Sequence, residues 1–469
     1  MKRSAEPFGR LPRGETSMYR NYTAVIQAGG RGTRMRELTK DLIPKPMLPL
    51  NGKPMIQRQI ENISGYGVSE FIIITGHLGE KIREYFGDGS KFGINIHYIE
   101  ESTPLGSAGA FYYLKDLIRT ENFLLVYADV MFCLEWNRMI DFHERNQGKA
   151  TLLVHPNGHP FDSDLLIMDE EAHVKGIDLK SNERSYWYEN CVNSGIYILS
   201  KDILEGISAA EKLDLEKDIL SPMMAENNVY GYRTPEYVKD AGTPERFHRA
   251  EAEQAAGIWE RRCLNQKQRC VFLDRDGTVN QYRGLIYQEE QFELEERAAE
   301  AVRRLNEAGY LAIVATNQPV VARGLCDIEE VKEIHRKMQV LLGNQRAYLD
   351  DIVFCPHHPD KGYPEENPKY KIVCNCRKPA SGMIEETALR YNIDLAESYM
   401  IGDSTADILA GRNAGVRTIL VLTGQAGKDG KYGVKPDSIA EDILDAVMQI
   451  IGNGDFHDER LQGTNKTIY

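Results

Sequence analysis

The sequence predicts an α/β protein of two domains, each built around a mainly parallel β-sheet. The first observation is length, because 469 residues suffice for two or three domains with separate cores. The second is an alternation of short apolar runs with segments of helical periodicity, which is typical of parallel strands joined by right-handed crossovers. The third is that several apolar runs end on acidic or glycine-rich residues, as strands do beside the ligand site of an open α/β sheet.

The composition restricts the partners and the compartment. The formal net charge of −13 argues against nonspecific binding to nucleic acid or to an anionic membrane. No apolar run approaches the ~18 residues of a membrane span. Eight cysteines are too few for a disulfide scaffold, and three of them cluster with a histidine, which favours a reducing compartment and a metal site. We therefore expect a cytoplasmic protein with small-molecule substrates, and we leave homo-oligomerisation open.

The ends of the chain and a polar stretch near its middle set the expected domain bounds. Residues 1–20 are polar and basic without an apolar core, so we expect a disordered extension and no secretory signal. A polar boundary at residues 264–269 separates a first domain, residues 21–263, from a second, residues 270–452. We expect residues 453–469 to form a polar tail.

The first apolar run, residues 22–27, predicts a strand that leads into a glycine-rich loop. The glycines of this loop would let backbone N–H groups approach a phosphate chain closely; they are Gly29, Gly30 and Gly32. Arg34 and Lys45 follow and would supply fixed positive charge as a pyrophosphate group leaves. A glycine-rich loop alone is equally consistent with a plain turn, so the interpretation depends on the residues around it.

Those surrounding residues form a specific pattern, since GGxGTR is followed by LT and then by PKP. The pattern resembles that of the sugar-1-phosphate nucleotidyltransferases, from about Tyr22 to about Arg249. The resemblance implies a Rossmann-like domain of the glycosyltransferase A type. It also implies direct attack of a sugar 1-phosphate on the α-phosphate of a nucleoside triphosphate. The implied nucleotide contacts are Gly29, Gly30, Gly32, Thr33 and Gly106, with Arg34 and Lys45 as catalytic cations.

The same resemblance assigns a metal pair and a sugar-binding strand. Asp129 ends an apolar run, and Asp240 lies far along the chain; they match the two aspartates that hold Mg²⁺ in the family. Asn193 and Gly195 match residues near the sugar. The family's Glu-Lys-Pro motif is absent, although Lys180 could still reach the sugar phosphate. In the loop of residues 100–110, Gly106 would face the nucleobase; a helix start at Ser107 explains the same residues, and both interpretations can hold.

The second domain opens with a buried strand that ends on two carboxylates, Asp274 and Asp276, followed by a glycine. One carboxylate can attack as a nucleophile while the other transfers a proton, provided that a cation lowers their repulsion. A second apolar strand ends on Thr316 and Asn317. For a lone match, a solvated Asp-x-Asp-Gly turn would be the better explanation.

The string DxDGT resembles the first motif of the haloacid dehalogenase-like phosphatases, and the C-terminal half resembles their heptose bisphosphate phosphatase branch. The resemblance implies that Asp274 is the nucleophile and that Asp276 is the acid and base. It also implies a Mg²⁺ site formed by Asp274, the backbone carbonyl of Asp276 and Asp403. It assigns the phosphoryl contacts to Thr316 and Lys378, with Asn317 in the catalytic set. Arg377 would contact substrate. About 40 residues separate Asp276 from Thr316, which leaves no room for an inserted cap domain.

Four soft or borderline metal ligands lie in the loop before Lys378: Cys355, His357, Cys374 and Cys376. They are enough to close a tetrahedral Zn²⁺ site, and with four protein ligands that zinc would be structural. Buried free thiols and a disulfide are the alternatives. The choice of His357 over its neighbour His358 follows the family pattern. Zinc would fix a loop that ends in the two phosphate-binding cations.

Together the two resemblances imply neighbouring steps of one pathway. The phosphatase would remove the 7-phosphate from a heptose 1,7-bisphosphate, and the transferase would use GTP to convert the heptose 1-phosphate into GDP-D-glycero-α-D-manno-heptose. Alternatives are another sugar 1-phosphate, such as mannose 1-phosphate, or another nucleotide. A histidinol-phosphate-type phosphatase would share the DxDGT motif and the zinc loop. A nucleotide-sensing scaffold with a non-catalytic N-terminal half is a further alternative, against which the retention of Arg34, Lys45, Asp129 and Asp240 argues.

Overall fold

The computed structural model describes residues 22–360, 362 and 365–452. By packing, the chain divides into two compact units. The first unit comprises residues 1–154, 166–178 and 193–263, and the second comprises residues 155–165, 179–192 and 264–469. The extension expected at residues 1–20 and the tail expected at residues 453–469 lie outside the described residues.

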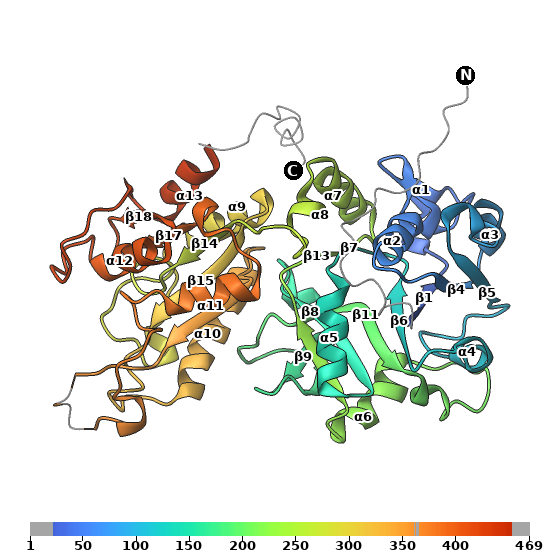
Figure 1. The fold of residues 1–469 in the computed structure, drawn as a ribbon, viewed down its shortest axis with the longest axis horizontal. Helices are drawn as coiled ribbons and strands as arrows, with labels where there is room; N and C mark the ends of the chain where they lie inside the picture. The colour runs from blue at the N-terminus through green and yellow to red at the C-terminus, as the bar shows by residue number, and fades with distance from the viewer. Residues whose placement is uncertain (1–21, 361, 363–364, 453–469) are drawn as a thin grey trace. The chain divides into compact units, whose positions relative to one another are not determined.

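A nine-stranded mixed sheet forms the first unit's framework (Figure 1). Its strands are β1 (Tyr22–Ala28), β4 (Glu70–Thr75), β5 (Asn95–Glu100), β6 (Asn122–Tyr127), β8 (Ala150–His155), β9 (Leu165–Met168), β10 (Val174–Asp178), β11 (Val192–Ser200) and β12 (Val229–Arg233). Strand β1 lies between β6 and β4 and is parallel to both, and β5 continues the parallel order. Strand β11 is antiparallel to β6, with Ile196 opposite Val126. A separate antiparallel pair joins β7 (Val130–Cys133) to β13 (Tyr237–Asp240).

The helices of the first unit pack on this sheet and on the β7–β13 pair. They are α1 (Arg36–Thr39), α2 (Met55–Ser64), α3 (Gly79–Phe86), α4 (Phe111–Leu117), α5 (Trp136–Asn146), α6 (Ser221–Ala225), α7 (Pro244–Ala255) and α8 (Ile258–Arg261). Helices α7 and α8 share a core with the β7–β13 pair. In α2 the buried residues Ile56, Ile60 and Ile63 recur at helical spacing and pack in one core with Ile26 and Val126 of the sheet. Full burial of each such side chain stabilises the unit by roughly 1.5–3 kcal/mol.

The second unit is built on a six-stranded sheet whose order is β16-β15-β14-β17-β18-β19. These strands are β14 (Cys270–Leu273), β15 (Leu311–Asn317), β16 (Asp351–Cys355), β17 (Tyr399–Gly402), β18 (Arg417–Val421) and β19 (Ser438–Ala440). Each neighbouring pair is parallel. All carboxyl ends of this sheet therefore meet at one edge. The predicted α/β fold class with two domains is confirmed. The first sheet contains parallel strands and also antiparallel strands.

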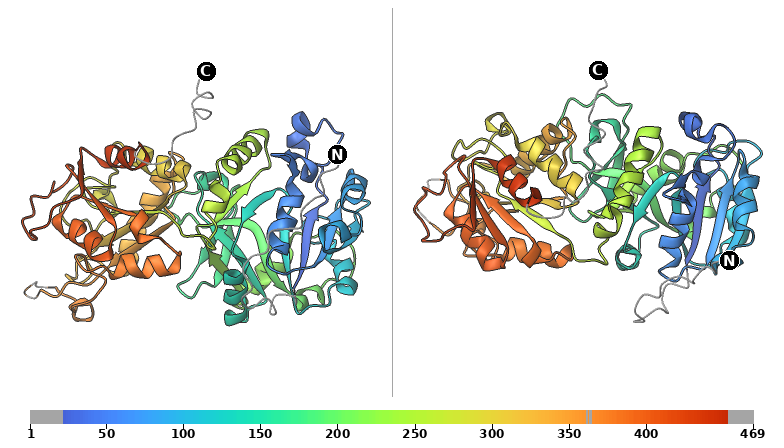
Figure 2. Two further views of the ribbon diagram at one scale, coloured as in Figure 1. Left: turned by 45° about the horizontal axis from the view of Figure 1, so that its top comes forward. Right: turned by 90° about the horizontal axis from the view of Figure 1, so that it is seen from above.

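Helices lie on both faces of the second sheet (Figure 2). They are α9 (Ala298–Ala308), α10 (Ile328–Gly343), α11 (Gly382–Arg390), α12 (Thr405–Ala414) and α13 (Ile443–Gly452). Residues of β14 alternate between two cores: Val271 and Leu273 pack with α9, α10 and α13, whereas Phe272 packs with α11 and α12. This alternation explains why the strand sequence is apolar at every position, since both faces of a doubly covered parallel strand are buried.

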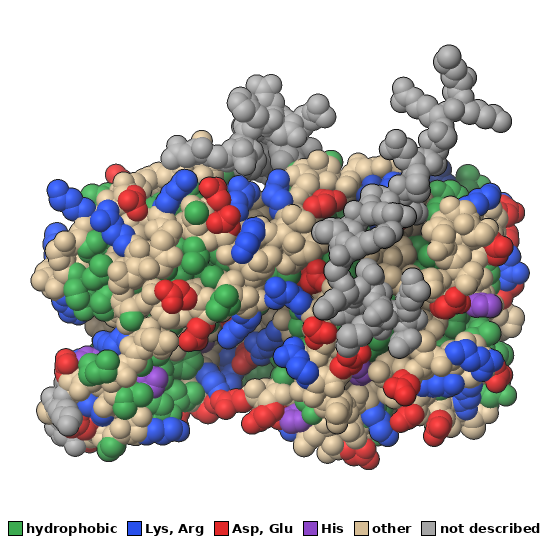
Figure 3. All heavy atoms as spheres, viewed as in Figure 1, with side chains coloured by type: hydrophobic (Ala, Val, Ile, Leu, Met, Phe, Trp, Pro, Cys, Tyr) green, Lys and Arg blue, Asp and Glu red, His purple; other side chains and the backbone are tan. Residues whose placement is uncertain are grey.

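The surface shows how the net charge is distributed. Acidic and basic side chains are both scattered over the face drawn in Figure 3, so the charge of −13 does not arise from one acidic patch there. Among the described residues, no helix combines the length and the apolar character needed to cross a lipid bilayer.

Candidate active sites

A cavity of about 460 Å³ opens at the carboxyl ends of β1 and β6 in the first unit. Eight of the site residues predicted from sequence line it: Gly29, Gly30, Gly32, Thr33, Arg34, Lys45, Gly106 and Asp129. These residues come from sequence positions up to a hundred apart. The parallel order of the strands brings them together, because it places the loops after β1 and β6 side by side.

Two of the three glycines in the loop, Gly29 and Gly32, lie close to neighbouring side chains, whereas a β-carbon on Gly30 would meet open space. A β-carbon on Gly29 would collide with the carboxylate of Glu101, and Gly32 has a φ of 60° with Lys45 Cβ 3.1 Å from where its own β-carbon would be. Glu101 and Gln27 also line the cavity, and each has a buried side-chain oxygen, Oε1, without a hydrogen-bond partner among the described residues. Burial raises the pKa of Glu101. The cavity wall thus offers acceptor atoms that a ligand can satisfy.

Lys45 and the two predicted metal ligands of the first unit, Asp129 and Asp240, lie in neighbouring segments, and Lys45 is buried. Lys45 Nζ lies 2.8 Å from Asp129 Oδ2. Asp240 ends β13, and its Oδ1 accepts the N–H of Gly242 at 2.6 Å while the guanidinium of Arg246 pairs with the same carboxylate. A β-carbon on Gly242 would lie 3.3 Å from Lys45 Nζ, so Asp240 and Lys45 flank that glycine. Of the predicted pair, Asp129 lines the cavity and contacts Lys45, whereas Asp240 is paired with Arg246 and lies beside Gly242, which also lines the cavity.

The predicted sugar-side residues divide between the two units. Asn193 and Gly195 lie on β11, and a β-carbon on Gly195 would lie 2.7 Å from the ring of Tyr127, which lines the cavity. Asn193 Nδ2 donates to Tyr197 Oη at 3.2 Å and to Glu216 at 3.4 Å. Lys180, by contrast, is exposed, belongs to a segment of the second unit, and is not among the cavity residues.

In the second unit, a cluster of carboxylates surrounds Lys378 at the ends of β14 and β17. Lys378 Nζ lies 2.7 Å from Asp274 Oδ1 and 2.5 Å from Asp407 Oδ1. Oxygen atoms of Asp274, Asp403 and Asp407 lie within 4.8 Å of one another. Asp407 was not predicted; it lies in the first turn of α12, where Ser404 Oγ donates to it at 2.6 Å. The sequence feature that could have identified Asp407 is its place in the string GDSTAD, four residues after Asp403.

The carboxylates of this cluster repel one another although the ammonium group of Lys378 lies among them. Burial raises the pKa of Asp274 to about 7 and that of Asp403 to about 8, and repulsion between the neighbouring carboxylates adds to both shifts. Asp403 Oδ2 accepts the N–H of Gln425 at 2.6 Å, whereas its Oδ1 is buried without a hydrogen-bond partner among the described residues. Several carboxylate oxygens in a small buried volume fit Mg²⁺, a hard cation that prefers oxygen ligands.

The side chain of Asp276 lies outside this group and is held by other residues. Arg275, which is fully buried, contacts both carboxylate oxygens of Asp276 at 2.9 and 3.0 Å. Gln318 donates to Asp276 Oδ2 at 2.9 Å and to Thr316 Oγ1 at 3.0 Å. The Asp276 carboxylate therefore lies outside the group formed by Asp274 and its partners, and the expected contribution of Asp276 to a Mg²⁺ site, its backbone carbonyl, stays a prediction. Gln318, which links Asp276 to Thr316, was not predicted.

Asn317 and Arg377 support the loop that carries Lys378. The Asn317 side chain accepts the backbone N–H of Lys378 at 2.9 Å and donates to its carbonyl at 3.0 Å. Arg377 donates to the carbonyl of His357 at 3.1 Å, and burial lowers the pKa of its guanidinium. Asn317 thus fixes the backbone at Lys378, whereas Arg377 is tied to the cysteine-rich loop.

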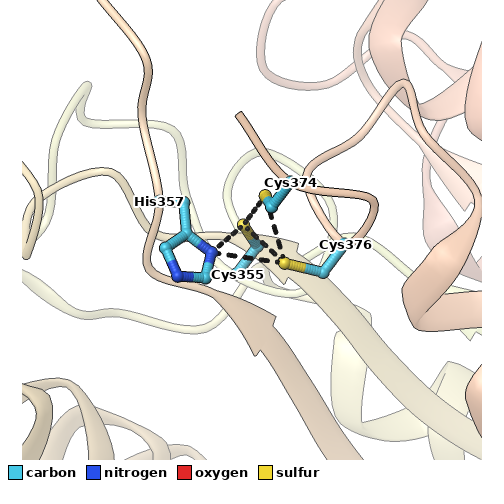
Figure 4. A group of neighbouring side chains, drawn as sticks. All are labelled: Cys355, His357, Cys374 and Cys376. Atoms are coloured by element: carbon cyan, nitrogen blue, oxygen red, sulfur yellow. Dashed lines mark hydrogen bonds between the residues drawn. The ribbon is translucent and has the colours of Figure 1, made fainter. Parts of the chain in front are cut away.

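The four predicted zinc ligands point toward one another (Figure 4). The Sγ atoms of Cys355, Cys374 and Cys376 are 3.2–3.6 Å apart, and His357 Nδ1 lies 3.6 Å from Cys355 and 3.4 Å from Cys376. Ligands at ~2.3 Å from a tetrahedral ion would be separated by about 3.8 Å, so a small expansion accommodates zinc. His358 lies outside this group, and its Nδ1 accepts the N–H of Asp360 at 3.2 Å.

Comparison with known proteins identifies a family for each part of the chain. Residues 23–257 match the nucleotidyl transferase family, and residues 375–446 match the HAD-hydrolase-like family. The chain is 30% identical over 237 residues to a mannose-1-phosphate guanylyltransferase of Mycobacterium tuberculosis, an alignment that includes 50% of this chain and 65% of that enzyme. It therefore spans slightly less than two thirds of that relative's length.

Two further relatives are covered almost completely. One is a D-glycero-alpha-D-manno-heptose 1-phosphate guanylyltransferase of Aneurinibacillus thermoaerophilus, with 30% identity over 49% of this chain and 97% of that protein. The other is a D-glycero-beta-D-manno-heptose-1,7-bisphosphate 7-phosphatase of Haemophilus ducreyi, with 38% identity over 39% of this chain and 98% of that protein. The chain thus resembles a different type of enzyme in each of its parts.

Proposed function

Because residues 23–257 belong to the nucleotidyl transferase family and the C-terminal part belongs to the heptose 1,7-bisphosphate 7-phosphatases, we propose that this chain is a bifunctional cytoplasmic enzyme of GDP-heptose biosynthesis. It dephosphorylates D-glycero-D-manno-heptose 1,7-bisphosphate at C7. It then transfers GMP from GTP to the heptose 1-phosphate, giving GDP-D-glycero-α-D-manno-heptose and pyrophosphate. Residues 21–263 carry the transferase and residues 270–452 the phosphatase, with the boundary at residues 264–269.

The phosphatase reaction uses the carboxylate at the end of β14 as its nucleophile. Asp274 attacks the phosphorus atom and forms an aspartyl phosphate. Asp276, oriented by Arg275 and Gln318, protonates the leaving sugar oxygen and then takes a proton from the attacking water. Lys378, held 2.7 Å from Asp274, neutralises charge on the phosphoryl oxygens. The hydroxyl of Thr316 donates a hydrogen bond to one of these oxygens.

The transferase reaction needs no covalent intermediate. A phosphate oxygen of the sugar 1-phosphate attacks the α-phosphate of GTP, and pyrophosphate leaves. The backbone N–H groups of the glycine-rich loop hold the triphosphate, while Arg34 and Lys45 stabilise the departing charge. Asn193 and Gly195 position the sugar. Catalysis then consists of positioning and charge neutralisation, which this cavity is built to provide.

Both active sites fit Mg²⁺, and the cysteine-rich loop fits Zn²⁺. Asp129 and Asp240 would hold Mg²⁺ in the transferase. In the phosphatase, Asp274, Asp403 and the backbone carbonyl of Asp276 would hold it, with Asp407 beside them. When bound, Mg²⁺ supplies charge neutralisation at phosphate oxygens. Zinc at Cys355, His357, Cys374 and Cys376 would be structural, because four protein ligands leave no position for water. Its effect would be to hold the loop that leads into Arg377 and Lys378.

The observation that carries this proposal is that each unit pairs a buried lysine with aspartate at a strand end: Lys45 contacts Asp129 in the first unit, and Lys378 contacts Asp274 and Asp407 in the second. Each pairing is suited to phosphate chemistry, and a relative of each part of the chain is named for a heptose phosphate. A scaffold that binds nucleotide without reacting would not need Lys45 paired with Asp129 at the cavity.

Phosphorus NMR on the purified chain with Mg²⁺ tests the proposal. Both anomers of heptose 1,7-bisphosphate are supplied, first alone and then with GTP, ATP, CTP or UTP. Heptose 1-phosphate should accumulate without nucleotide and should convert to GDP-heptose when GTP is added. Mannose 1-phosphate and histidinol phosphate serve as comparison substrates. Faster turnover with another nucleotide or with mannose 1-phosphate would contradict the guanylyl and heptose assignments. Failure to release the 7-phosphate while histidinol phosphate is hydrolysed would contradict the pathway.

A further inference from the structure

The carboxylate of Glu216, which no sequence motif identified, connects β11, the strand that carries Asn193, to the wall of the transferase cavity. Glu216 Oε1 accepts the hydroxyl of Tyr197 at 2.5 Å, the amide of Asn193 at 3.4 Å and the hydroxyl of Tyr127 at 3.5 Å. Burial and the nearby carboxylate raise the pKa values of Tyr127 and Tyr197 well above the usual range. Both phenols therefore remain protonated donors to Glu216.

Tyr127 connects these hydrogen bonds to the cavity, because it donates to Glu216 and also lines the cavity. Its ring lines the cavity and packs edge-on against Tyr197, with ring centroids 5.7 Å apart. On its other side, Gly195 of β11 brings the backbone against the ring, where a β-carbon would lie 2.7 Å from Tyr127 Cδ2. A shift of the Tyr127 hydroxyl would therefore move both the cavity wall and the strand that carries Asn193.

The backbone beside Glu216 performs a different task. Glu216 lies in a π-helical turn, η7 (Leu215–Leu220), a type of turn that is frequent at functional sites. Just before it, the N–H of Leu213 donates to the carbonyl of Leu105 and its carbonyl accepts from Ala108, at 3.0 and 3.1 Å. The N–H of Leu215 donates to Ser107 Oγ at 2.7 Å. This segment thus holds the loop that contains Gly106 by contacts that do not involve the Glu216 side chain.

We propose that Glu216 is a positioning residue for the sugar 1-phosphate in the transferase reaction. Its carboxylate fixes Asn193 and Tyr127 on the sugar side of the cavity, whereas the adjoining backbone fixes the nucleotide loop. The inference rests on the proposed function and adds a residue to it. Removing the carboxylate should therefore weaken binding of the sugar phosphate and leave binding of the nucleotide nearly unchanged.

Four variants of the full chain separate this role from a general loss of structure. Glu216→Ala removes the carboxylate, and Glu216→Gln keeps its shape and an acceptor oxygen. Tyr197→Phe removes the hydroxyl that donates to Glu216 at 2.5 Å and accepts from Asn193 at 3.2 Å, and it leaves the carboxylate in place. Glu226→Gln is the matched control, since Glu226 is exposed near the same segment and contacts Asn228 at 3.0 Å. Initial rates of pyrophosphate release are measured with each substrate varied in turn, sugar 1-phosphate binding is measured by calorimetry, and phosphate release reports on the folded second unit.

Glu216→Ala should raise KM and Kd for the sugar 1-phosphate about tenfold or more while KM for the nucleotide changes less than about threefold. Tyr197→Phe should act in the same direction with a smaller effect, Glu216→Gln should recover most of the affinity, and Glu226→Gln should match the wild type. Equal loss for both substrates, or a lower kcat at unchanged KM, would show a structural role and overturn the inference. A wild-type protein that neither binds nor uses any sugar 1-phosphate would overturn the proposed function as well.

Discussion

Replacing Lys378 with methionine, Lys378→Met, should abolish the phosphatase activity and destabilise the metal-free second unit. The substitution keeps the length of the side chain and removes its charge. In the structure the Lys378 ammonium lies 2.7 Å from Asp274 and 2.5 Å from Asp407, and the carboxylates of Asp274, Asp403 and Asp407 lie within 4.8 Å of one another. Without the ammonium group, this buried cluster would hold negative charges that no longer have their neighbouring cation.

The size of the effect follows from these distances. At an effective dielectric constant of about 20, a charge pair 2.7 Å apart attracts by roughly 6 kcal/mol before desolvation is subtracted. Removing one partner of a buried pair costs about 3–5 kcal/mol in practice, because the other charge stays buried. Loss of a group that stabilises charge in the transition state lowers kcat by about 10²–10³-fold. Both losses are large enough to measure in one protein.

The assay combines phosphate release from heptose 1,7-bisphosphate with urea denaturation, each done with Mg²⁺ and with a chelator. Lys378→Met should release phosphate at least about 10²-fold more slowly. Mg²⁺ should restore part of its free energy of unfolding and little of its activity, because the cation can offset carboxylate repulsion without replacing the contact to the phosphoryl group. The control is Lys369→Met, an exposed lysine of the same loop. A Lys378→Met protein with near wild-type phosphate release and unchanged stability would refute this reasoning.

Three further predictions concern the metals and the independence of the two sites. Cys374→Ser should lower the zinc content measured after exhaustive dialysis and reduce phosphate release while sparing pyrophosphate release; a protein that never contained zinc would contradict this. Asp274→Asn should lower phosphate release by at least ~10³-fold and spare guanylyl transfer, and Asp129→Ala should do the reverse; loss of both activities from either change in a folded protein would refute the two-site assignment. The pKa values of Asp274 and Asp403 are raised from 3.8 to about 7 and about 8, so the stability that these groups contribute is complete below their unfolded pKa of 3.8 and is lost as the pH rises through 7 to 8. In chelator, urea denaturation should therefore give a lower free energy of unfolding at pH 9 than at pH 6, and Mg²⁺ should reduce that difference; a difference that Mg²⁺ leaves unchanged would assign it to other groups.

Sequence patterns predicted the strands that carry chemistry because those strands are both apolar and terminated by distinctive residues. The run before Asp274 became β14, and the run before the glycine-rich loop became β1. The clustering of Cys355 with His357, Cys374 and Cys376 was also predictable, since two closely spaced pairs can close one site. Asp274, the glycine-rich loop and Cys355 are at or directly after strand ends, whereas Cys374 and Cys376 lie in the loop between β16 and α11.

Other site residues could not be predicted, because their positions depend on packing between distant segments. Glu216 reaches the cavity wall through hydrogen bonds to residues 19 and 89 positions away, and it lies in no recognisable motif. The carboxylate of Asp276 lies close to Asp274 in sequence, yet the buried Arg275 and Gln318 hold it apart from the metal-binding group. Lys180 was assigned from a degenerate motif, and it does not line the cavity. Spacing alone does not determine where such side chains point.

The backbone crossing beside Asp403 restricts how this enzyme can evolve. Gly277 and Gly424 both have positive φ angles, and a β-carbon on Gly277 would lie 3.0 Å from the Gly424 Cα and would collide with the Asp403 carboxylate. A β-carbon on Gly424 would collide with that carboxylate too. Any substitution of a glycine introduces a β-carbon. A compensating substitution at the other glycine cannot relieve the clash, because glycine is already the smallest residue. We therefore expect both glycines to be retained wherever the phosphatase is active. A lineage that has lost either glycine should have lost the phosphatase activity while keeping an intact transferase.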